Sequence, residues 1–288
     1  MDSIALQKLP SYKSPPVVEV ALSAQFKPLP ALGIAQLGAL WIQFKSRFPR
    51  TEQYPPLPHL VERTGVRQPL AIPELRIMTG TDMMARLWMI NASGNELVQV
   101  QQDRFVRNWR KALGPSTDYP RYELHLRPQF SNDIALFAQF IQSEGLGNLE
   151  FDQCEVTYVN HIRTCSVWRS HKDLAKVFRG WSKEYESSIL PNAESISVRT
   201  RQLINDASGK FLGRLHVELD SAFLESDASQ PSDELAAAFM LQLVARGLPI
   251  GSGVAGLIEF LNLGRAEIVS AFDRMTTPEM HEEWGKEL

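Results

Sequence analysis

The chain has 288 residues, of which 44% are hydrophobic and 22% are charged, and its formal net charge at pH 7 is −3. This balance is ordinary for a globular protein and excludes a disordered, collagen-like or coiled-coil chain. The small negative charge excludes a general attraction to nucleic acids or anionic membranes, so any such contact would need a local basic patch. At this length the chain forms either one large fold or two halves of similar size.

The cysteine content and the apolar segments indicate where the protein works. Cys154 and Cys165 are too few for a disulfide framework and form no C-x-x-C pair, which fits a reducing cytosol. The start at Met1 shows neither the basic region nor the apolar core of a secretion signal. The most apolar stretches, 235–250 and 254–263, contain polar residues and are shorter than the ~20 apolar residues of a membrane helix. We therefore expect a cytoplasmic protein without membrane contact.

The first half begins with a predicted strand and a predicted helix. Hydrophobic residues alternate with other residues from Val18 to Phe26, which is typical of a half-buried strand. Residues 37–48 then carry large hydrophobic side chains at helical spacing, which predicts a core-facing helix. Prolines recur between residues 54 and 73, so we expect an extended surface connection there.

A hairpin and a second helix complete the first half. Residues 86–92 and 96–109 are rich in β-forming residues and are separated by a short glycine-containing turn, which predicts two paired strands. Ser131 then caps a predicted helix that ends at Gly145 and Gly147.

The second half repeats this order. Residues 153–162 alternate as a strand, and residues 174–185 have the pattern of an amphipathic helix. Strands over 194–204 and 211–220 are predicted to form a second hairpin around the polar turn between them. Ser232, with acidic residues after it, is expected to open a helix that runs to Arg246.

Short elements are expected at the C-terminal end of the chain. Residues 256–261 could form one further strand, and residues 266–275 are predicted to form a helix. Thr277 followed by Pro278 favours the start of another helix, because threonine caps helices and proline suits the first helical position.

The two halves, 1–150 and 151–288, therefore share the order β-α-β-β-α. This order, with one more strand, is the ferredoxin-like unit, an antiparallel sheet with both helices on one face. We predict an α+β protein made of two tandem ferredoxin-like halves with antiparallel sheets, followed by C-terminal helices. No residue-level repeat accompanies the pattern.

Residues 251–256 match the pattern G-x-G-x-x-G of dinucleotide-binding turns. Such a site needs a strand before the turn, a helix opening at it and a parallel βαβ unit around it. Because a helix is predicted to end at Arg246, the sequence favours a flexible connection instead.

Metal and nucleophile signatures are weak. His216, Glu218 and Asp220 alternate along one predicted strand, so their side chains share a face and could gather a metal ion. Arg214 lies on the same face, which favours an exposed charged surface. The other histidines lack zinc-type spacing, and no G-x-S-x-G motif is present. We expect no metal, no cofactor and no identifiable catalytic residue.

Basic and aromatic residues interleave from Arg104 to Lys111, and the second hairpin carries further basic residues at a comparable place. On a sheet surface such a mixture can stack bases or rings while guanidinium groups hold phosphates. An alternative is that Phe105 and Trp109, which share a strand face, belong to the core with arginines at its edge. The candidate ligand-binding or nucleic-acid-binding residues are Arg104, Arg107, Trp109, Arg110, Arg199, Arg201, Arg214 and His216.

Several short motifs occur in a characteristic order along nearly the whole chain. They are Pro15-Pro16-Val17-Val18-Glu19 at the first strand, Asp103-Arg104-Phe105 with Asn108-Trp109, the pair Tyr119 and Tyr122, and Tyr158-Val159-Asn160-His161-Ile162 in a central strand. Together they resemble a sporadically distributed family of uncharacterised bacterial proteins. The resemblance implies a bacterial, cytoplasmic protein, distributed as mobile or defence-related genes are, and it supplies no catalytic residues. That family carries a His-Glu pair in its C-terminal helix, whereas this chain has Gly264-Arg265-Ala266-Glu267 there, so no role for a histidine carries over.

Three functional hypotheses follow. The first is a non-enzymatic binding or adaptor protein, within a phage-defence or toxin–antitoxin type of gene cluster, whose partner is another protein. The second is an RNA-binding or RNA-processing protein similar to the tandem ferredoxin-like proteins of CRISPR systems, with single-stranded RNA as partner and residues 247–256 as the glycine-rich loop. The third is a small-molecule enzyme with its site between the halves, because such interfaces often form pockets.

Overall fold

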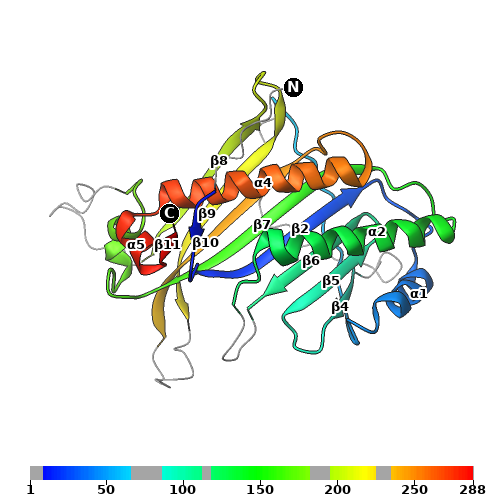
Figure 1. Ribbon diagram of the computed structural model, residues 1–288, viewed down its shortest axis with the longest axis horizontal. Coiled ribbons are helices and arrows are strands. Elements are labelled where there is room, and N and C mark those ends of the chain that lie inside the picture. Colours follow the sequence, from blue (N-terminus) through cyan, green and yellow to red (C-terminus); the bar gives the residue numbers. More distant parts are fainter. Residues whose placement is uncertain (1–8, 66–85, 112–117, 182–194, 225–234, 288) are drawn as a thin grey trace.

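The computed structural model describes residues 9–65, 86–111, 118–181, 195–224 and 235–287 (Figure 1). The strands are β1 (Ser11–Tyr12), β2 (Val17–Phe26), β3 (Arg50–Tyr54), β4 (Arg86–Ile90), β5 (Glu96–Gln101), β6 (Arg104–Arg110), β7 (Phe151–Arg163), β8 (Ser197–Asn205), β9 (Phe211–Leu224), β10 (Ala236–Gly247) and β11 (Lys286–Glu287). The α-helices are α1 (Ile34–Phe44), α2 (Arg127–Ser143), α3 (Leu174–Val177), α4 (Gly253–Met275) and α5 (Pro278–Glu283). One π-helical turn, Tyr122–Leu126, leads into α2, and one 3-10 turn, His171–Asp173, leads into α3.

In the described residues, nine strands form one continuous sheet in the order β3-β4-β5-β6-β2-β7-β10-β9-β8. Every pairing in this sheet is antiparallel. The first half of the chain supplies the block from β3 to β2, and the second half supplies the block from β7 to β8. Within each block, the strand that comes first along the chain pairs with the strand that comes last. These pairs are β2 with β6 and β7 with β10. The two halves meet at the β2–β7 pair, and the predicted α+β class with antiparallel strands is confirmed.

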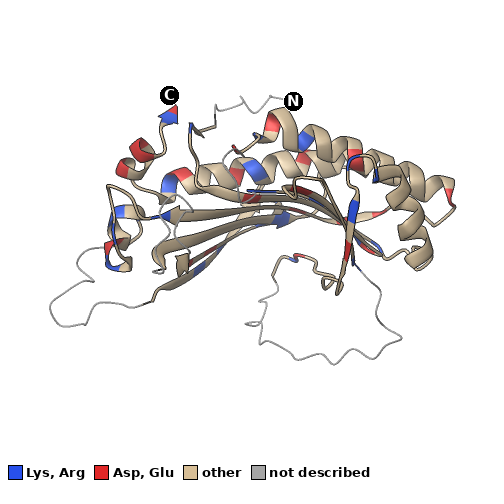
Figure 2. Ribbon diagram, turned by 90° about the horizontal axis from the view of Figure 1, so that it is seen from below, with Lys and Arg blue, Asp and Glu red and all other residues tan. Residues whose placement is uncertain are grey.

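The helices α1, α2 and α4 lie on one face of the sheet, which we call the helix face (Figures 1 and 2). The opposite side, the open face, carries no helix of the described residues. The strand period of two assigns side chains to these faces. In β2, for example, Phe26 contacts Phe137 of α2 with ring centroids 5.7 Å apart, whereas the neighbouring Gln25 points to the open face.

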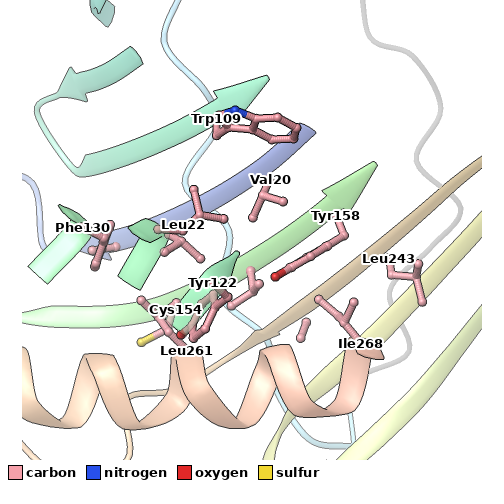
Figure 3. Close-up of a cluster of buried hydrophobic side chains, with 14 of the residues drawn as sticks. Val20, Leu22, Trp109, Tyr122, Phe130, Cys154, Tyr158, Leu243, Leu261 and Ile268 are labelled. Atoms are coloured by element: carbon pink, nitrogen blue, oxygen red, sulfur yellow. The ribbon is translucent and has the colours of Figure 1, made fainter. Parts of the chain in front are cut away.

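The hydrophobic core lies between the sheet and the two long helices (Figure 3). Val20 and Leu22 of β2 and Val156 of β7 are almost fully buried, and α4 covers them with Phe260 and Leu261. Burying large apolar side chains of this kind stabilises a fold by about 1.5–3 kcal/mol each. No helix in the described part of the chain is long and apolar enough to cross a lipid bilayer.

Most of the predicted strands are confirmed, with one subdivision. The expected strand over 96–109 is two strands, β5 and β6, because the chain turns back at Gln102 and Asp103. Strand β3 pairs with β4 where no strand was expected. The prolines after Tyr54 do keep residues 55–63 free of helix and strand, and residues 66–73 of the predicted connection lie outside the described residues.

Two predicted helices differ in their limits. Helix α2 begins at Arg127 rather than at a cap on Ser131, and it ends as expected before Gly145, whose φ is +63°. The helix predicted over 174–185 is wrong at 178–181, because α3 ends at Val177 and Phe178 turns to an extended conformation that bridges to Thr276. Residues 182–185 lie outside the described residues.

The largest correction concerns residues 236–261. The helix predicted to end at Arg246 is wrong there, since Ala236–Gly247 is strand β10, hydrogen-bonded to β7 and β9 along its length. The strand predicted at 256–261 is also wrong, because these residues belong to α4. In the described residues, the order from β7 to α4 is therefore β-α-β-β-β-α. The helix predicted to start at Thr277 and Pro278 is confirmed as α5, and the Thr277 side chain caps it by accepting a hydrogen bond from the Met280 amide.

The glycine-rich turn at 251–256 consequently has a different context from the one expected. A strand precedes it and α4 opens at Gly253, but the strand belongs to an antiparallel sheet, so the parallel unit of a dinucleotide site is missing from the described residues. Gly251 and Gly253 have φ values of +96° and +60°, which favour glycine. A Cβ on Gly256 would lie 2.6 Å from the carbonyl carbon of Gly251. The glycines are thus explained by the tight turn itself.

Candidate functional site

Two of the predicted surface residues, Arg107 and Trp109, are part of the core. Both point to the helix face, and their exposed fractions are 4% and 2%. Arg107 forms ion pairs with Asp133 of α2, at 2.5 Å, and with Glu96 of β5. Arg47 reaches the other oxygen of Asp133 at 2.6 Å. Arg107 therefore fastens α2 to the sheet and is unable to contribute to an exposed binding surface.

Three other candidates, Arg104, Arg214 and His216, lie on the open face beneath an extended segment. This segment, residues 55–65, we call the strap. Arg104 donates to the carbonyl of Pro58 at 2.8 Å and also to the side chain of Gln25. Arg214 and His216 both contact the carboxylate of Glu62, with His216 Nε2 2.7 Å from Oε1. The basic residues of the two hairpins hold this part of the chain itself.

Glutamines also bind the strap. Three of them, on β5, β2 and β7, form hydrogen bonds from the open face to the backbone of the strap. The pairs are Gln101 with Leu57, Gln25 with Leu60, and Gln153 with Glu62. Gln25, for example, accepts from the Leu60 amide at 3.0 Å and donates to the Leu60 carbonyl at 2.7 Å. The strap thereby satisfies polar groups that would otherwise be buried without partners.

Glu62 is a residue of the strap whose carboxylate points to the sheet, and its side chain is only 1% exposed. Burial raises the pKa of this carboxyl group, but hydrogen bonds from His216 and Arg214 and the nearby charge of Arg246 outweigh burial. The net effect lowers the pKa from its usual 4.5 to about 2. A lowered pKa of a carboxylate means that the native state binds protons less readily than the unfolded chain.

We predict that Glu62 contributes stability above pH 4.5 that is lost as the pH falls toward about 2. The Glu62→Gln variant should therefore be less stable than the parent at pH 7, and the difference should narrow across that window. Urea unfolding followed by circular dichroism at several pH values measures both free energies. A stability difference that stays constant from pH 6 to pH 2.5 would contradict this role of Glu62.

The remaining candidates are Arg110, Arg199 and Arg201. Arg110 donates from Nε to the carbonyl of Gly94 at 2.8 Å. Arg199 and Arg201 are exposed on the edge strand β8, opposite Glu218 and His216 of β9. Since Arg107 points to the helix face and Arg199 and Arg201 to the open face, the eight candidates do not form one shared surface.

The structure brings no metal site together in its described part. His216, Glu218 and Asp220 do share the open face of β9, as their spacing predicts. Nevertheless, no group of three or more histidine, cysteine, aspartate or glutamate side chains in the described ranges is arranged to hold a metal ion. Cys154 and Cys165 are both free, and burial raises the pKa of the Cys154 thiol.

A cavity of about 360 Å³ lies on the helix face where the two halves meet. The first half contributes Val17 and Tyr122, and the second half contributes Tyr158, Leu243 and Ile268. Figure 3 labels the last three and Tyr122 among the buried side chains of this region. Strand β1, which pairs with β11, closes one side, and α4 closes another. We call this cavity the seam pocket. Its volume lies in the range of pockets that bind small organic molecules.

The walls of the seam pocket are mainly apolar, with a few polar groups directed into it. Four tyrosines, Tyr12, Tyr119, Tyr122 and Tyr158, supply phenol groups. The hydroxyls of Tyr119 and Tyr158 are 2.8 Å apart, and Tyr122 donates to Asn262 at 3.0 Å. Burial raises the pKa of all four phenols, so each is uncharged near neutral pH. The pocket thus offers neutral hydrogen-bonding groups within an apolar lining.

Two arginines also line the seam pocket. Arg265 of α4 has its guanidinium 5.2 Å from the ring centre of Tyr122, and Arg121 lies 5.8 Å from that of Tyr119. Arg121 is the non-glycine residue with positive φ, +66°, among the described residues. Such backbone conformations cost about 1–3 kcal/mol and concentrate at ligand-binding sites.

In the sequence, Tyr119, Arg121 and Tyr122 follow the basic and aromatic stretch that was the candidate nucleic-acid surface, and no pattern connects them with Tyr158 or with a cavity. The other residues that line the pocket come from residues 10–17, from β10 and from α4, which are far apart along the chain. The signal that the sequence does contain is the pairing of arginine with nearby tyrosine at 119–122. It could not indicate that Arg265 lies at the same place.

Comparison of the chain with protein-family models, with curated proteins and with solved structures finds no match.

Proposed function

We propose that this protein is a non-enzymatic binding protein that holds a small organic ligand in the seam pocket. The carrying observation is a cavity of about 360 Å³, bounded by both halves, that combines apolar walls with uncharged phenols and two arginines. Largely preformed concave sites with few directed polar groups are the usual form of ligand pockets. Tyr12 of the lining donates to the Asp273 carboxylate, and burial raises the pKa of its phenol, which favours an uncharged binding group over an activated nucleophile.

The two-unit organisation predicted from the sequence supports this proposal. We propose that the halves are duplicated units, because each has a first strand, a short helix, an antiparallel run of strands and a long helix. A pocket at the junction of two such units is enclosed only when both are present. The bacterial cytoplasm, and a gene neighbourhood of the defence type, remain proposals that rest on the family resemblance.

Binding of single-stranded RNA or of a protein partner on the open face is a second candidate. The exposed Arg199 and Arg201 on β8 favour it. It is weaker than the seam pocket, because Arg107 and Trp109 are buried and Arg104, Arg214 and His216 already hold the strap.

The test is a thermal-shift measurement with a panel of neutral, anionic and cationic aromatic fragments. Ligands that bind the native state raise the melting temperature. We expect hits for the parent chain and their loss in Val269→Trp, since this half-buried residue of α4 lines the pocket and a larger ring would fill it. Ile42→Trp, at an exposed position of α1, is the matched control and should keep the hits. Hits that persist in Val269→Trp, or no hits for the parent, would refute the proposed site.

A further inference from the structure

The guanidinium group of Arg265 is incompletely paired inside the seam pocket. Its Nε atom is buried and has no hydrogen-bond partner. Its Nη1 atom is 3.6 Å from Glu123, whereas Arg127 contacts the other oxygen of that carboxylate at 3.0 Å. A buried donor without a partner costs about 1–3 kcal/mol, so such a group is usually satisfied by something.

The Arg121 side chain is only loosely held by the residues that the structure describes. Among them, its Nη1 atom donates to Ser11 Oγ at 3.5 Å, which is at the limit for a hydrogen bond. Its guanidinium instead lies over the ring of Tyr119. The positive φ of Arg121 sets the direction of its side chain, which lies beside residues 10–17 at the edge of the pocket.

The charged side chains that line the pocket are equal in number, Arg121 and Arg265 against Glu123 and Glu287. Glu123 is shared with Arg127, which does not line the pocket and contacts this carboxylate at 3.0 Å. Arg265 is therefore the more distant partner of Glu123, at 3.6 Å, and keeps hydrogen-bonding capacity for an anionic group in the pocket.

We infer that the seam pocket takes a small carboxylic acid with an aromatic or aliphatic body, and that Arg265 receives the carboxylate. This inference rests on the proposed function. Guanidinium and carboxylate groups match in a planar, two-bond geometry, which would satisfy the Arg265 Nε atom. The apolar residues Leu243, Ile268 and Phe272 surround the body of the acid, and the Tyr119–Tyr158 hydroxyl pair offers a further hydrogen bond.

The experiment is isothermal titration calorimetry of the full chain with 2-naphthoate and with 2-naphthol, which share a ring system and differ in charge. The parent chain is expected to bind 2-naphthoate about tenfold or more tightly than 2-naphthol, as for a hydrogen bond to a charged group. Arg265→Met should remove this preference, because it should weaken 2-naphthoate binding far more than 2-naphthol binding. Arg201→Met, which removes an exposed arginine outside the pocket, should keep the preference.

The outcomes separate the two proposals. Equal binding of the two compounds, or a preference that survives in Arg265→Met, overturns the carboxylate inference and leaves the seam pocket as a ligand site. Failure of both compounds to bind the parent overturns the carboxylate inference too, and the fragment panel with Val269→Trp then decides the proposed function separately. If Arg265→Met unfolds, Arg265→Lys supplies the comparison: it keeps the charge but not the planar fork, and a wholly unchanged preference would overturn the role of the guanidinium.

Discussion

Replacing Arg107 by alanine is expected to lower the free energy of unfolding by about 3–5 kcal/mol, because the substitution removes the buried cation that two enclosed carboxylates share. Asp133 has a 1% exposed side chain and Glu96 an 18% exposed one, and both are ion-paired with Arg107. Arg47 continues to contact Asp133 after the substitution, but its own side chain is 41% exposed and is a weaker partner. Urea unfolding followed by circular dichroism measures the change.

Two further variants make this prediction specific. Arg201→Ala removes an exposed arginine of β8 and should change the free energy of unfolding by less than about 0.5 kcal/mol. The double variant Arg107→Met with Asp133→Leu removes both charges and should recover a large part of the loss, since apolar side chains can replace a buried ion pair. A loss below about 1 kcal/mol for Arg107→Ala would show that the pair does not hold α2 to the sheet.

The second large effect is expected for Gly247→Ala, at the end of β10. An added Cβ would lie 2.1 Å from the Leu212 carbonyl oxygen and 2.4 Å from a ring carbon of Phe260. Neither group can withdraw cheaply, because one is backbone of the paired strand and the other is a fully buried ring. We expect a loss of about 3 kcal/mol, at the upper end of the usual cost of overpacking.

Gly38→Ala is the matched control for this substitution. Gly38 lies inside α1, and a Cβ there would meet nothing within 4 Å. Alanine is favoured over glycine in a helix by about 0.5–1 kcal/mol, so this variant should be slightly more stable than the parent. Thermal unfolding of the two variants in parallel should show shifts of opposite sign. A Gly247→Ala protein as stable as the parent would mean that α4 does not pack closely over the end of β10.

The burial of Arg107 could have been read from the sequence. Phe105, Arg107 and Trp109 alternate along one strand, so a face that buries the two aromatic rings buries the arginine as well. The alternation therefore supported the core interpretation of this stretch over the surface one. The sequence did not reveal the partner, because Asp133 lies on α2, on the far side of a turn and a chain reversal.

Strand β10 shows where local patterns mislead. Its residues include several alanines and leucines with Met240 and Gln242, which favour a helix by intrinsic propensity. In the folded chain this segment lies between β7 and β9, and the ladders on both sides satisfy its backbone. Pairing with the neighbouring strands overrides helix propensity here. The wrong helix prediction also affected the next segment, because it placed a helix instead of a strand before the glycine-rich turn.

The sequence by itself determined the α+β class and the strands with clear alternation, such as β2, β7 and β9. These features depend on neighbours within a few residues, and hydrophobic periodicity records them directly. Only the tertiary structure decided that the halves share one sheet, that the strap occupies basic residues of the open face, and that Tyr119, Tyr158 and Arg265 line one cavity. Contacts of this kind join residues far apart along the chain, and no local pattern encodes which distant groups will meet.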